Sequence, residues 1–472
     1  MADWHALSRR DLLRGLGAAI AVSGLAAVGC STPPTPTAAP ASKPSAPVPT
    51  QASSQQAPAP TVAAQPKATT ATMTIKVSTR ADPAQEFMRT YGKEFEQAHS
   101  GVSVVVEDIP ATEYFVKIRA LAASKQVGDV VWGNISGGAF LNFAAMGIIR
   151  PLDDLAKREG ANFLKQWYAP AVAVGSLDGK LYALPEIATP GNAVLVWNET
   201  AFGEAGVPAP TLDWDLDKDF LPAADKLTKR SGDRVERFGT DLDKTYLGLV
   251  PMLRRWGGEF ISPDGKKCLL DSPGNEKPVQ FMLDLHAKYK VAPSPQQIEE
   301  NSTKMFVAGK VASLLAVPIA VVATNRAAVG EKFKYSGMLT PKGPAGRGTM
   351  LAANHNGISS LSQVVDQAWE LLKLYSSKEV GIKKVSIGSG SPGARPDVYN
   401  DPQLHQYDPI YKIAAVAMED VGPHLLPYNV RGSEMMKVLD NEMDKVWLGK
   451  VDVAAGIKNA TAEVQKVLDQ PR

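Results

Sequence analysis

Residues 73–132 read MTIKVSTRADPAQEFMRTYGKEFEQAHSGVSVVVEDIPATEYFVKIRALAASKQVGDVVW, and this stretch decides the fold class. Residues 74–78 alternate between apolar and polar, which predicts a strand. Apolar side chains at helical spacing then predict a helix that starts near Pro83 and ends at Gly101. A second strand over 102–106, a helix over about 112–124 and a third strand over 129–132 follow. This alternation predicts an α/β fold with a parallel sheet and crossover helices.

The rest of the chain is large and, toward its end, rich in helix. Two segments carry apolar side chains on a single helical face: Val365, Ala368, Trp369, Leu372 and Tyr375 in the first, and Met435, Leu439, Met443, Val446 and Trp447 in the second. With 472 residues, two domains are expected. A net charge of +2 without a basic stripe argues against a nucleic-acid partner.

The chain begins with features of an export signal. Ser8-Arg9-Arg10 leads into a small, weakly apolar run over residues 15–29 that ends at Cys30. The run 26–30 resembles the bacterial lipobox, with Ala27 where Leu is most common, and the paired arginines resemble the signal for export of folded proteins. Residues 1–30 are therefore expected to be a twin-arginine lipoprotein signal, with lipid on Cys30 and an exported, membrane-anchored, extracytoplasmic product. The alternative, a membrane-spanning anchor, is disfavoured by the Gly and Ala content of the run.

Residues 31–72 form the predicted linker. They contain ten prolines, two lysines and no aromatic residue. Such a segment cannot bury enough apolar surface to offset its ordering entropy, so it is expected to be a disordered tether. If Cys30 is lipidated, Cys268 has no disulfide partner in the chain and is expected to fill apolar core.

The sequence contains no recognisable catalytic or metal-binding motif. None of its six histidines pairs with another histidine or a cysteine at metal-ligand spacing, and no Walker-type loop occurs. The run 388–393, GSGSPG, does not place glycines as a nucleophile elbow requires, and it fits a flexible loop better. The chain is therefore expected to be a non-enzyme without a cofactor or metal.

Several phrases, in order, resemble the extracellular solute-binding proteins of ATP-driven importers, particularly the sugar-binding proteins related to maltose-binding protein. The most specific is DGKLYALP at residues 178–185, followed by VWNETAF at 196–202. Supporting phrases are GDVVWG at 128–133, AGVPAPT at 205–211, the FxxGKVA pattern at 306–312 and AWELLK at 368–373. Trp197, where the family usually has Tyr, and the run 213–215 depart from the family pattern in detail.

The resemblance implies a periplasmic-binding-protein-like fold of type II, in which two discontinuous α/β lobes close around a ligand by hinge motion. Lobe 1 is expected to comprise residues 73–175 and 340–392, and lobe 2 residues 176–339 and 393–472. The chain would cross between lobes near 175–180, 336–342 and 391–397.

Ligands of open α/β sheets bind beyond the carboxyl ends of the strands, and this rule selects the candidate site. Amides, acids and tryptophan suit a sugar, which offers hydroxyls and apolar C–H faces. Trp256 and Arg395 join the set because their surroundings resemble family positions near the cleft. The ligand-binding candidates are Thr79, Arg80, Asp82, Trp132, Asn134, Ser136, Glu186, Asn192, Trp256, Asn354, His355, Asn356 and Arg395.

Each candidate also has a structural explanation. Trp132 could close the sheet core, His355 could bond to backbone, and Arg80 could pair with Asp82. Trp167, Trp214, Trp369 and Trp447 are expected to serve packing.

The expected function is therefore capture of a small solute, a sugar or oligosaccharide, by a membrane-tethered monomer that presents it to the permease subunits of an ABC importer. Three alternatives stay open: a non-sugar solute such as a polyamine, a glycerol phosphate or a metal chelate; a ligand sensor for a membrane receptor; and, least favoured, an exported hydrolase.

Overall fold

The computed structural model describes residues 73–134, 139–298, 300–420 and 429–471. The expected export signal and linker, with Cys30, and the candidate Ser136 lie outside the described residues. No helix among the described residues is long and apolar enough to cross a membrane.

A five-stranded sheet in the order β2-β1-β3-β13-β6 contains the predicted N-terminal strands. Its strands are β1 (Met73–Ala81), β2 (Val102–Pro110), β3 (Val130–Asn134), β6 (Ala183–Gly191) and β13 (Met350–Ile358). β1 pairs in parallel with β2 and β3, as the sequence predicts, whereas β13 is antiparallel to both β3 and β6. The carboxyl ends of β1, β3 and β6 therefore point the same way.

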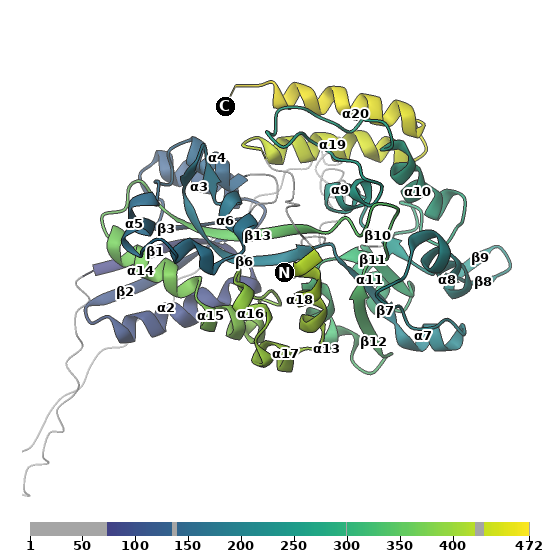
Figure 1. Cartoon of the computed structure of the whole chain (residues 1–472), viewed down its shortest axis with the longest axis horizontal. Helices are drawn as coiled ribbons and strands as arrows, with labels where there is room; N and C mark the ends of the chain where they lie inside the picture. The colour runs from purple at the N-terminus through teal and green to yellow at the C-terminus, as the bar shows by residue number, and fades with distance from the viewer. Residues whose placement is uncertain (1–72, 135–138, 299, 421–428, 472) are drawn as a thin grey trace, which may run out of the picture. The chain divides into compact units, whose positions relative to one another are not determined.

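Helices cover both faces of this sheet, with α3, α4 and α6 on one side and α2 and α15 on the other (Figure 1). The predicted first helix is α2, which buries Phe87, Met88, Tyr91 and Phe95. The helical segments beside this sheet are η1 (Pro83–Gln85), α2 (Glu86–Ala98), α3 (Tyr114–Ala123), α4 (Ala139–Ala145), α5 (Asp153–Arg158), η3 (Phe163–Gln166), α6 (Ala169–Val174), α14 (Val365–Tyr375), α15 (Lys378–Lys383) and η5 (Lys384–Ile387).

A second sheet of four strands has the order β10-β11-β7-β12. Its strands are β7 (Val194–Asn198), β10 (Asp241–Leu242), β11 (Ser313–Val317) and β12 (Tyr335–Leu339). Two small hairpins complete the strands: β4 (Ser176–Leu177) with β5 (Lys180–Leu181), and β8 (Lys229–Ser231) with β9 (Arg234–Arg237).

The remaining helices belong to the second half of the fold and the C-terminal region. They are α7 (Glu199–Glu204), η4 (Leu216–Phe220), α8 (Leu221–Leu227), α9 (Tyr246–Arg255), α10 (Glu276–Ala287), α11 (Ser302–Val307), α12 (Ile319–Thr324), α13 (Arg326–Val329), α16 (Pro396–Tyr399), α17 (Pro402–Tyr407), α18 (Ile410–Asp420), α19 (Gly432–Trp447) and α20 (Val453–Leu468). The two predicted helical faces lie on α14 and α19, and all ten side chains that define them are buried except the half-buried Val365.

The chain passes between the two sheets at two places that the strand pairing identifies. β6 continues through Asn192 and Ala193 into β7, and β12 leads through residues 340–349 into β13. The segment near 175–180, where the first crossing was expected, instead forms the β4–β5 hairpin. Near the third expected crossing, Gly393 bridges to Ile187 of β6. The division into lobes remains a prediction, but the pairing of β6 favours a first boundary near residue 192.

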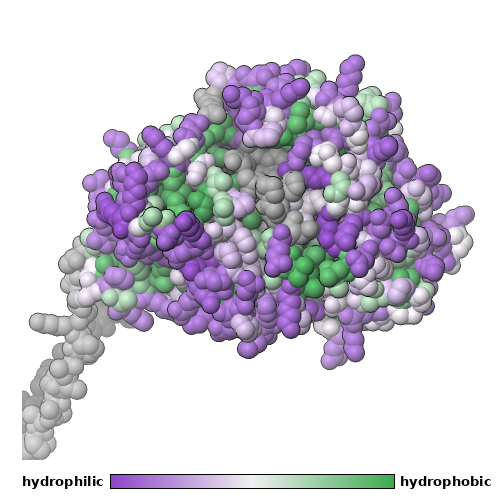
Figure 2. Space-filling model, in the orientation of Figure 1, coloured by the Kyte–Doolittle hydropathy of each residue, from purple (hydrophilic) through white to green (hydrophobic). Residues whose placement is uncertain are grey.

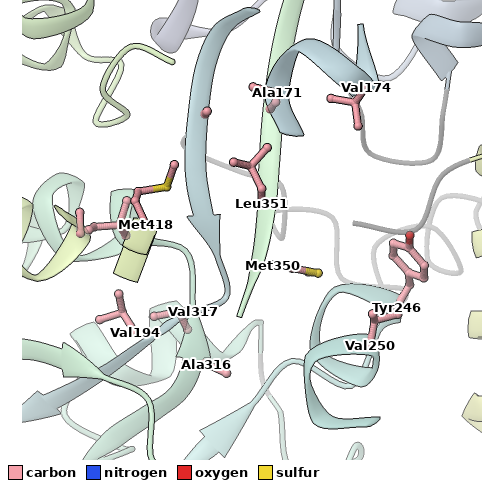
Figure 3. Close-up of a cluster of buried hydrophobic side chains, with 14 of the residues drawn as sticks. Ala171, Val174, Val194, Tyr246, Val250, Ala316, Val317, Met350, Leu351 and Met418 are labelled. Carbon is pink, nitrogen blue, oxygen red and sulfur yellow. The ribbon is translucent and has the colours of Figure 1, made fainter. Parts of the chain in front are cut away.

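One buried apolar cluster runs through both sheets. Figure 3 shows part of it around β13, where labelled side chains from α6, α9, α18 and strands of both sheets meet. Cys268 is a free, buried cysteine in this core, as expected. Trp167, Trp214, Trp369 and Trp447 are buried in it too, which confirms their packing role. On the face shown in Figure 2, hydrophilic side chains predominate and apolar areas are small.

Helix α9 is tied to both connections between the sheets. Asn192 donates from Nδ2 to the Leu247 carbonyl at 2.7 Å. The buried Arg255 donates from Nε to the Arg347 carbonyl at 2.9 Å and from Nη2 to the Thr340 hydroxyl at 2.8 Å. Burial and nearby Arg347 lower the pKa of Arg255 to about 9. No sequence pattern marks this buried arginine, because arginine is usually exposed.

The run 388–393, expected to be a flexible loop, packs into the fold. Ser389 and Ser391 are buried, and the Ser389 hydroxyl donates to the Ser391 carbonyl at 3.1 Å. The glycines allow close packing here, since a Cβ on Gly393 would lie 2.6 Å from the backbone of Gly381.

Candidate functional site

Buried polar side chains gather at the carboxyl ends of β1 and β3. Thr79 lies one residue beyond the Ser78–Val131 pair of β1 and β3, which places it beside Trp132. Across β3 and β13, Trp132 pairs with Asn356 and Asn134 pairs with Asn354. Since alternate strand residues share a face, Trp132, Asn134, Asn354 and Asn356 lie on the same face of the sheet.

Glu186 joins this group at a β-bulge of β6. Asn354 of β13 pairs with Ile187 of β6, whereas the next residue, His355, pairs with Pro185, so Glu186 is the extra residue. Since Leu184 pairs with Asn356, alternation along β6 places Glu186 on the same face as Asn356. The Glu186 carboxylate accepts a hydrogen bond from Asn356 Nδ2 at 3.3 Å, and it is fully buried.

Lys384 of η5 supplies the counter-charge to Glu186. Its Nζ donates to the Glu186 carbonyl at 2.8 Å and lies 3.4 Å from Oε1 of the carboxylate. Both side chains are fully buried, and Nζ also lies 4.9 Å from the centre of the Phe87 ring. Burial raises the pKa of Glu186, while Lys384, Asn356 and Trp132 counteract this effect. Burial likewise lowers the pKa of Lys384 to about 8, against the attraction of Glu186.

Trp132 is enclosed rather than open. Arg80 lies over its ring with the guanidinium carbon 5.0 Å from the ring centre, and Tyr114 packs edge-on at 5.4 Å. The Tyr114 hydroxyl hydrogen-bonds to the backbone carbonyls of Ser78 and Trp132. Arg80 forms an ion pair with Asp82, as the structural explanation anticipated. The ring therefore presents no uncovered face like the one expected for a sugar-stacking platform.

The strongest sign of a ligand site is a set of buried polar atoms without protein partners. Asn134 has neither its amide nitrogen nor its amide oxygen bonded, and neither atom of the Gln85 amide is bonded. Thr79 Oγ1, Asn356 Oδ1 and the Trp132 indole nitrogen also lack a well-aligned hydrogen bond, although the indole approaches Glu186. An unpaired buried polar group costs about 1–3 kcal/mol, so the cluster favours a bound polar molecule.

We call this group the polar cluster. It comprises Thr79, Arg80, Asp82, Gln85, Trp132, Asn134, Glu186, Asn356 and Lys384.

Two members of the polar cluster were missed by sequence reasoning. Gln85 lies between Asp82 and Phe87, both of which contact other members, and its place after Asp82-Pro83 at a helix start was the available signal. Lys384 gave no signal, because a lysine in the run Lys383-Lys384 reads as surface.

His355 belongs to the opposite face of the sheet. Its Nε2 hydrogen-bonds to the Ala171 carbonyl of α6 at 2.7 Å, and its ring stacks near Phe140. Burial lowers the pKa of His355 to about 4. These contacts support the backbone-bonding explanation for this residue.

The other candidates make contacts outside the polar cluster. Asn192 adopts a positive φ of 47° and bonds to α9. The half-buried Trp256 packs on Phe281 of α10 at 5.4 Å between ring centres. Arg395 pairs with Asp397 and donates to Gln166 Oε1 at 2.6 Å. Asn354 is half-buried beside the cluster.

A separate open pocket of about 440 Å³ lies beside the connection between β12 and β13, and it includes Lys342, Arg347 and Glu419. None of the candidate residues lines it.

The charges of the polar cluster balance one another. Arg80 is paired with Asp82 and Lys384 with Glu186, so the two charges of each sign cancel. Besides the ion-paired Arg80, the members with unbonded buried atoms carry neutral groups: amides, a hydroxyl and an indole. Among the described residues, no group of three His, Cys, Asp or Glu side chains could hold a metal ion. The arrangement suits hydrogen bonding to a neutral, polyhydroxylated molecule.

Comparisons with known proteins agree with this architecture. Residues 78–382 match the family described as bacterial extracellular solute-binding protein. A protein of Brucella abortus (strain 2308), whose assignment as a binding protein is itself an inference, is 24% identical over 382 residues. The match covers 80% of this chain and 88% of that protein.

Solved structures with this fold include ABC-transporter binding proteins. A substrate-binding protein of Listeria monocytogenes in complex with cycloalternan has a TM-score of 0.72 at 22% identity, covering 84% of this chain and 98% of that one. A solute-binding protein of Thermotoga lettingae bound to α-D-tagatose has a TM-score of 0.71 at 24% identity, covering 84% and 100%. A Streptomyces glaucescens receptor, solved unliganded and with acarbose, scores 0.70 at 20% identity, covering 85% and 100%. These likenesses confirm the expected fold, the type II fold of periplasmic binding proteins.

Proposed function

The chain belongs to the family of bacterial extracellular solute-binding proteins, and we propose that it captures a neutral carbohydrate at the polar cluster. The observation that carries the proposal is the set of buried, unbonded neutral groups on Thr79, Gln85, Asn134 and Asn356. Sugar hydroxyls both donate and accept hydrogen bonds, so they can satisfy amide nitrogens, amide oxygens and a hydroxyl together. A ligand that bonds to these groups removes the desolvation cost that they carry when unbonded.

The charge balance favours a neutral ligand over charged ones. A polyamine would need uncompensated carboxylates and a glycerol phosphate uncompensated cations, because a buried charge requires a partner. In the polar cluster the carboxylates of Asp82 and Glu186 already face Arg80 and Lys384. The sugars held by the similar structures, cycloalternan, tagatose and acarbose, support the same class.

The same proposal covers delivery and location. As in other members of the family, the partner would be the permease subunits of an ABC importer, which receive the solute from a monomeric binding protein. The signal over residues 1–30 would direct export, and lipid on Cys30 would hold the folded part near the outer face of the membrane through the 31–72 tether. The proposed function is binding, as in the other members of the family.

Hinge closure would bring two lobes together around the ligand. The expected lobes, 73–175 with 340–392 and 176–339 with 393–472, agree with the two sheets except over β6. Since β6 pairs within the first sheet, a boundary near residue 192 fits the strand pairing better. The bonds from Asn192 and Arg255 to their neighbours make α9 the element that both connections share.

A thermal-shift titration tests the function. The full chain, unfolded and refolded to remove carried-over ligand, is titrated with neutral mono- and oligosaccharides, polyamines and glycerol phosphates. A binder at 100 times its Kd stabilises the folded state by about 2.7 kcal/mol, which raises Tm measurably. A concentration-dependent rise with one neutral sugar class and none with the charged compounds is expected. A rise in Tm only with a polyamine or a phosphate would overturn the proposal of a neutral ligand. Conversion of the bound sugar to a product would overturn the proposal that the protein only binds its ligand.

A further inference from the structure

Lys384 is an unusual residue to find fully buried, and its contacts explain why it is there. It begins η5, and helices α14 and α15 lie between it and β13 in the sequence. Its Nζ contacts both the backbone carbonyl and the carboxylate of Glu186. A lone buried lysine or carboxylate is strongly unfavourable, whereas a hydrogen-bonded pair is tolerated. Lys384 therefore favours the ionised form of the Glu186 carboxylate and holds its side chain in place.

The charged state of Glu186 determines which way the Asn356 amide faces. An ionised carboxylate only accepts hydrogen bonds, so the Asn356 group within 3.3 Å of Glu186 Oε2 must be the NH2 group. The amide oxygen then lies on the other side, buried and without a partner. If residue 186 were a neutral amide, the Asn356 side chain could turn over and present its NH2 group instead.

The orientation of Asn356 has a consequence for selectivity. A fixed amide oxygen can bind only a ligand group that donates a hydrogen, such as a hydroxyl. A fluorine at the same ligand position cannot donate, and it would leave the buried oxygen unpaired. A site built to bond a ligand hydroxyl discriminates strongly against the analogue that lacks it.

We propose that Lys384 is a positioning residue for the binding site: through Glu186 it holds the Asn356 amide with its oxygen toward the ligand, and so makes the site selective for a hydroxyl donor at that position. This inference rests on the proposed function. It concerns the specificity of the polar cluster and assigns Lys384 no contact with the ligand.

The test uses four variants of the full chain. Lys384→Met removes the counter-charge, Glu186→Gln replaces the acceptor, and Glu186→Gln combined with Lys384→Met removes both charges while preserving volume. The control is Lys383→Met, because the neighbouring Lys383 is half-exposed and pairs with Glu379 on the surface. The double variant keeps the test available if Lys384→Met alone fails to fold, since it leaves no unpaired buried charge.

Calorimetry with maltotriose, mannotriose, acarbose and tagatose first identifies a sugar that binds the wild-type chain. Monodeoxyfluoro derivatives of that sugar, one hydroxyl at a time, are then titrated into each protein. In the wild type and in Lys383→Met, one position should show an affinity loss of at least about tenfold on fluorination, the scale of one lost hydrogen bond at a buried group. In the double variant that loss should shrink to within about threefold, because the Asn356 amide can turn its oxygen away from the fluorine.

The outcomes separate the two proposals. If the wild type binds none of the neutral sugars but binds a charged solute, the proposed function fails, and this inference fails with it. If the wild type binds a sugar and the fluorine discrimination is the same in all variants, the binding function stands and the positioning role of Lys384 is refuted. A uniform loss of affinity for parent and fluorinated sugars would indicate a merely structural role and would refute it as well.

Discussion

The histidine His355 gives a prediction whose size follows directly from the structure. Its imidazole is buried and donates to the Ala171 carbonyl at 2.7 Å, and burial lowers its pKa from 6.5 to about 4. In the unfolded chain the same histidine takes up a proton at its ordinary pKa near 6.5. Between pH 6.5 and 4 the unfolded state therefore binds more protons than the folded state, and stability must fall as the pH falls.

The magnitude follows from the shift. Each pH unit in this window costs about 1.4 kcal/mol, so lowering the pH from 7 to 5 removes about 2 kcal/mol of unfolding free energy through His355 alone. Complete titration to below pH 4 removes about 3 kcal/mol. The loss is absent above pH 7, where the histidine is neutral in both states.

Urea unfolding followed by tryptophan fluorescence at pH 7 and pH 5 measures the effect. His355→Gln keeps a donor for Ala171 but cannot titrate, so its stability should fall by about 2 kcal/mol less than that of the wild type over this pH range. His99→Gln, at an exposed histidine, controls for a general effect of losing one imidazole. Equal pH dependence in wild type and His355→Gln would refute the burial argument.

Three further substitutions have expected outcomes. Lys125 follows the end of α3 with a left-handed φ of 59° in a Schellman motif. Lys125→Gly should therefore raise the unfolding free energy by about 1 kcal/mol in urea titrations. A lower unfolding free energy in the variant would contradict the strain assigned to Lys125. Tyr114→Phe leaves the Ser78 and Trp132 carbonyls without their side-chain donor, so it should lower the unfolding free energy by about 1–2 kcal/mol. An unchanged unfolding free energy would disprove this contribution. Trp132→Ala removes the indole that approaches Glu186 and the ring that Arg80 covers, so it should weaken sugar binding by about 1–3 kcal/mol in calorimetry, and an unchanged Kd would remove Trp132 from the site.

Local sequence patterns predicted β1, β2, β3 and the helices between them, but not β6 and β13 of the same sheet. The alternation in β1 and the helical spacing of α2 describe burial of one face, and the structure confirms both. The β-branched run of β2 forms a strand as predicted, but its residues over 102–107 are mostly half-buried. The parallel pairing followed from the crossover helices, which leave no short connection for antiparallel strands. The late helices α14 and α19 were predictable because apolar side chains recur on one face of each helix.

The chain crossings were harder to place, because no local pattern marks the sheet to which a strand belongs. β6 is buried along its whole length and reads equally well as a strand of either sheet. Its partner β13 lies far along the chain, and only their pairing shows that the crossing follows Gly191.

The site was predictable in part. The rule that ligands bind beyond the carboxyl ends of strands selected Thr79, Trp132 and Asn134 correctly as neighbours. The same rule could not separate the two faces of one strand, so it grouped His355 with Asn356 although they point to opposite sides. Lys384 lay beyond the reach of sequence reasoning, since its buried partner, Glu186, lies far away in the sequence.

Calorimetry on Asn134→Ala and Asn198→Ala tests the central claim, that the unbonded groups of the polar cluster bind a neutral sugar. Asn134 makes no protein hydrogen bond through its amide, whereas Asn198, equally buried, caps α7 by accepting from the Ala201 amide at 2.9 Å. We expect Asn134→Ala to weaken sugar binding at least about tenfold with little loss of stability, and Asn198→Ala to cost about 1 kcal/mol of stability with unchanged Kd. Unchanged sugar affinity in Asn134→Ala would contradict the assignment of the polar cluster as the binding site.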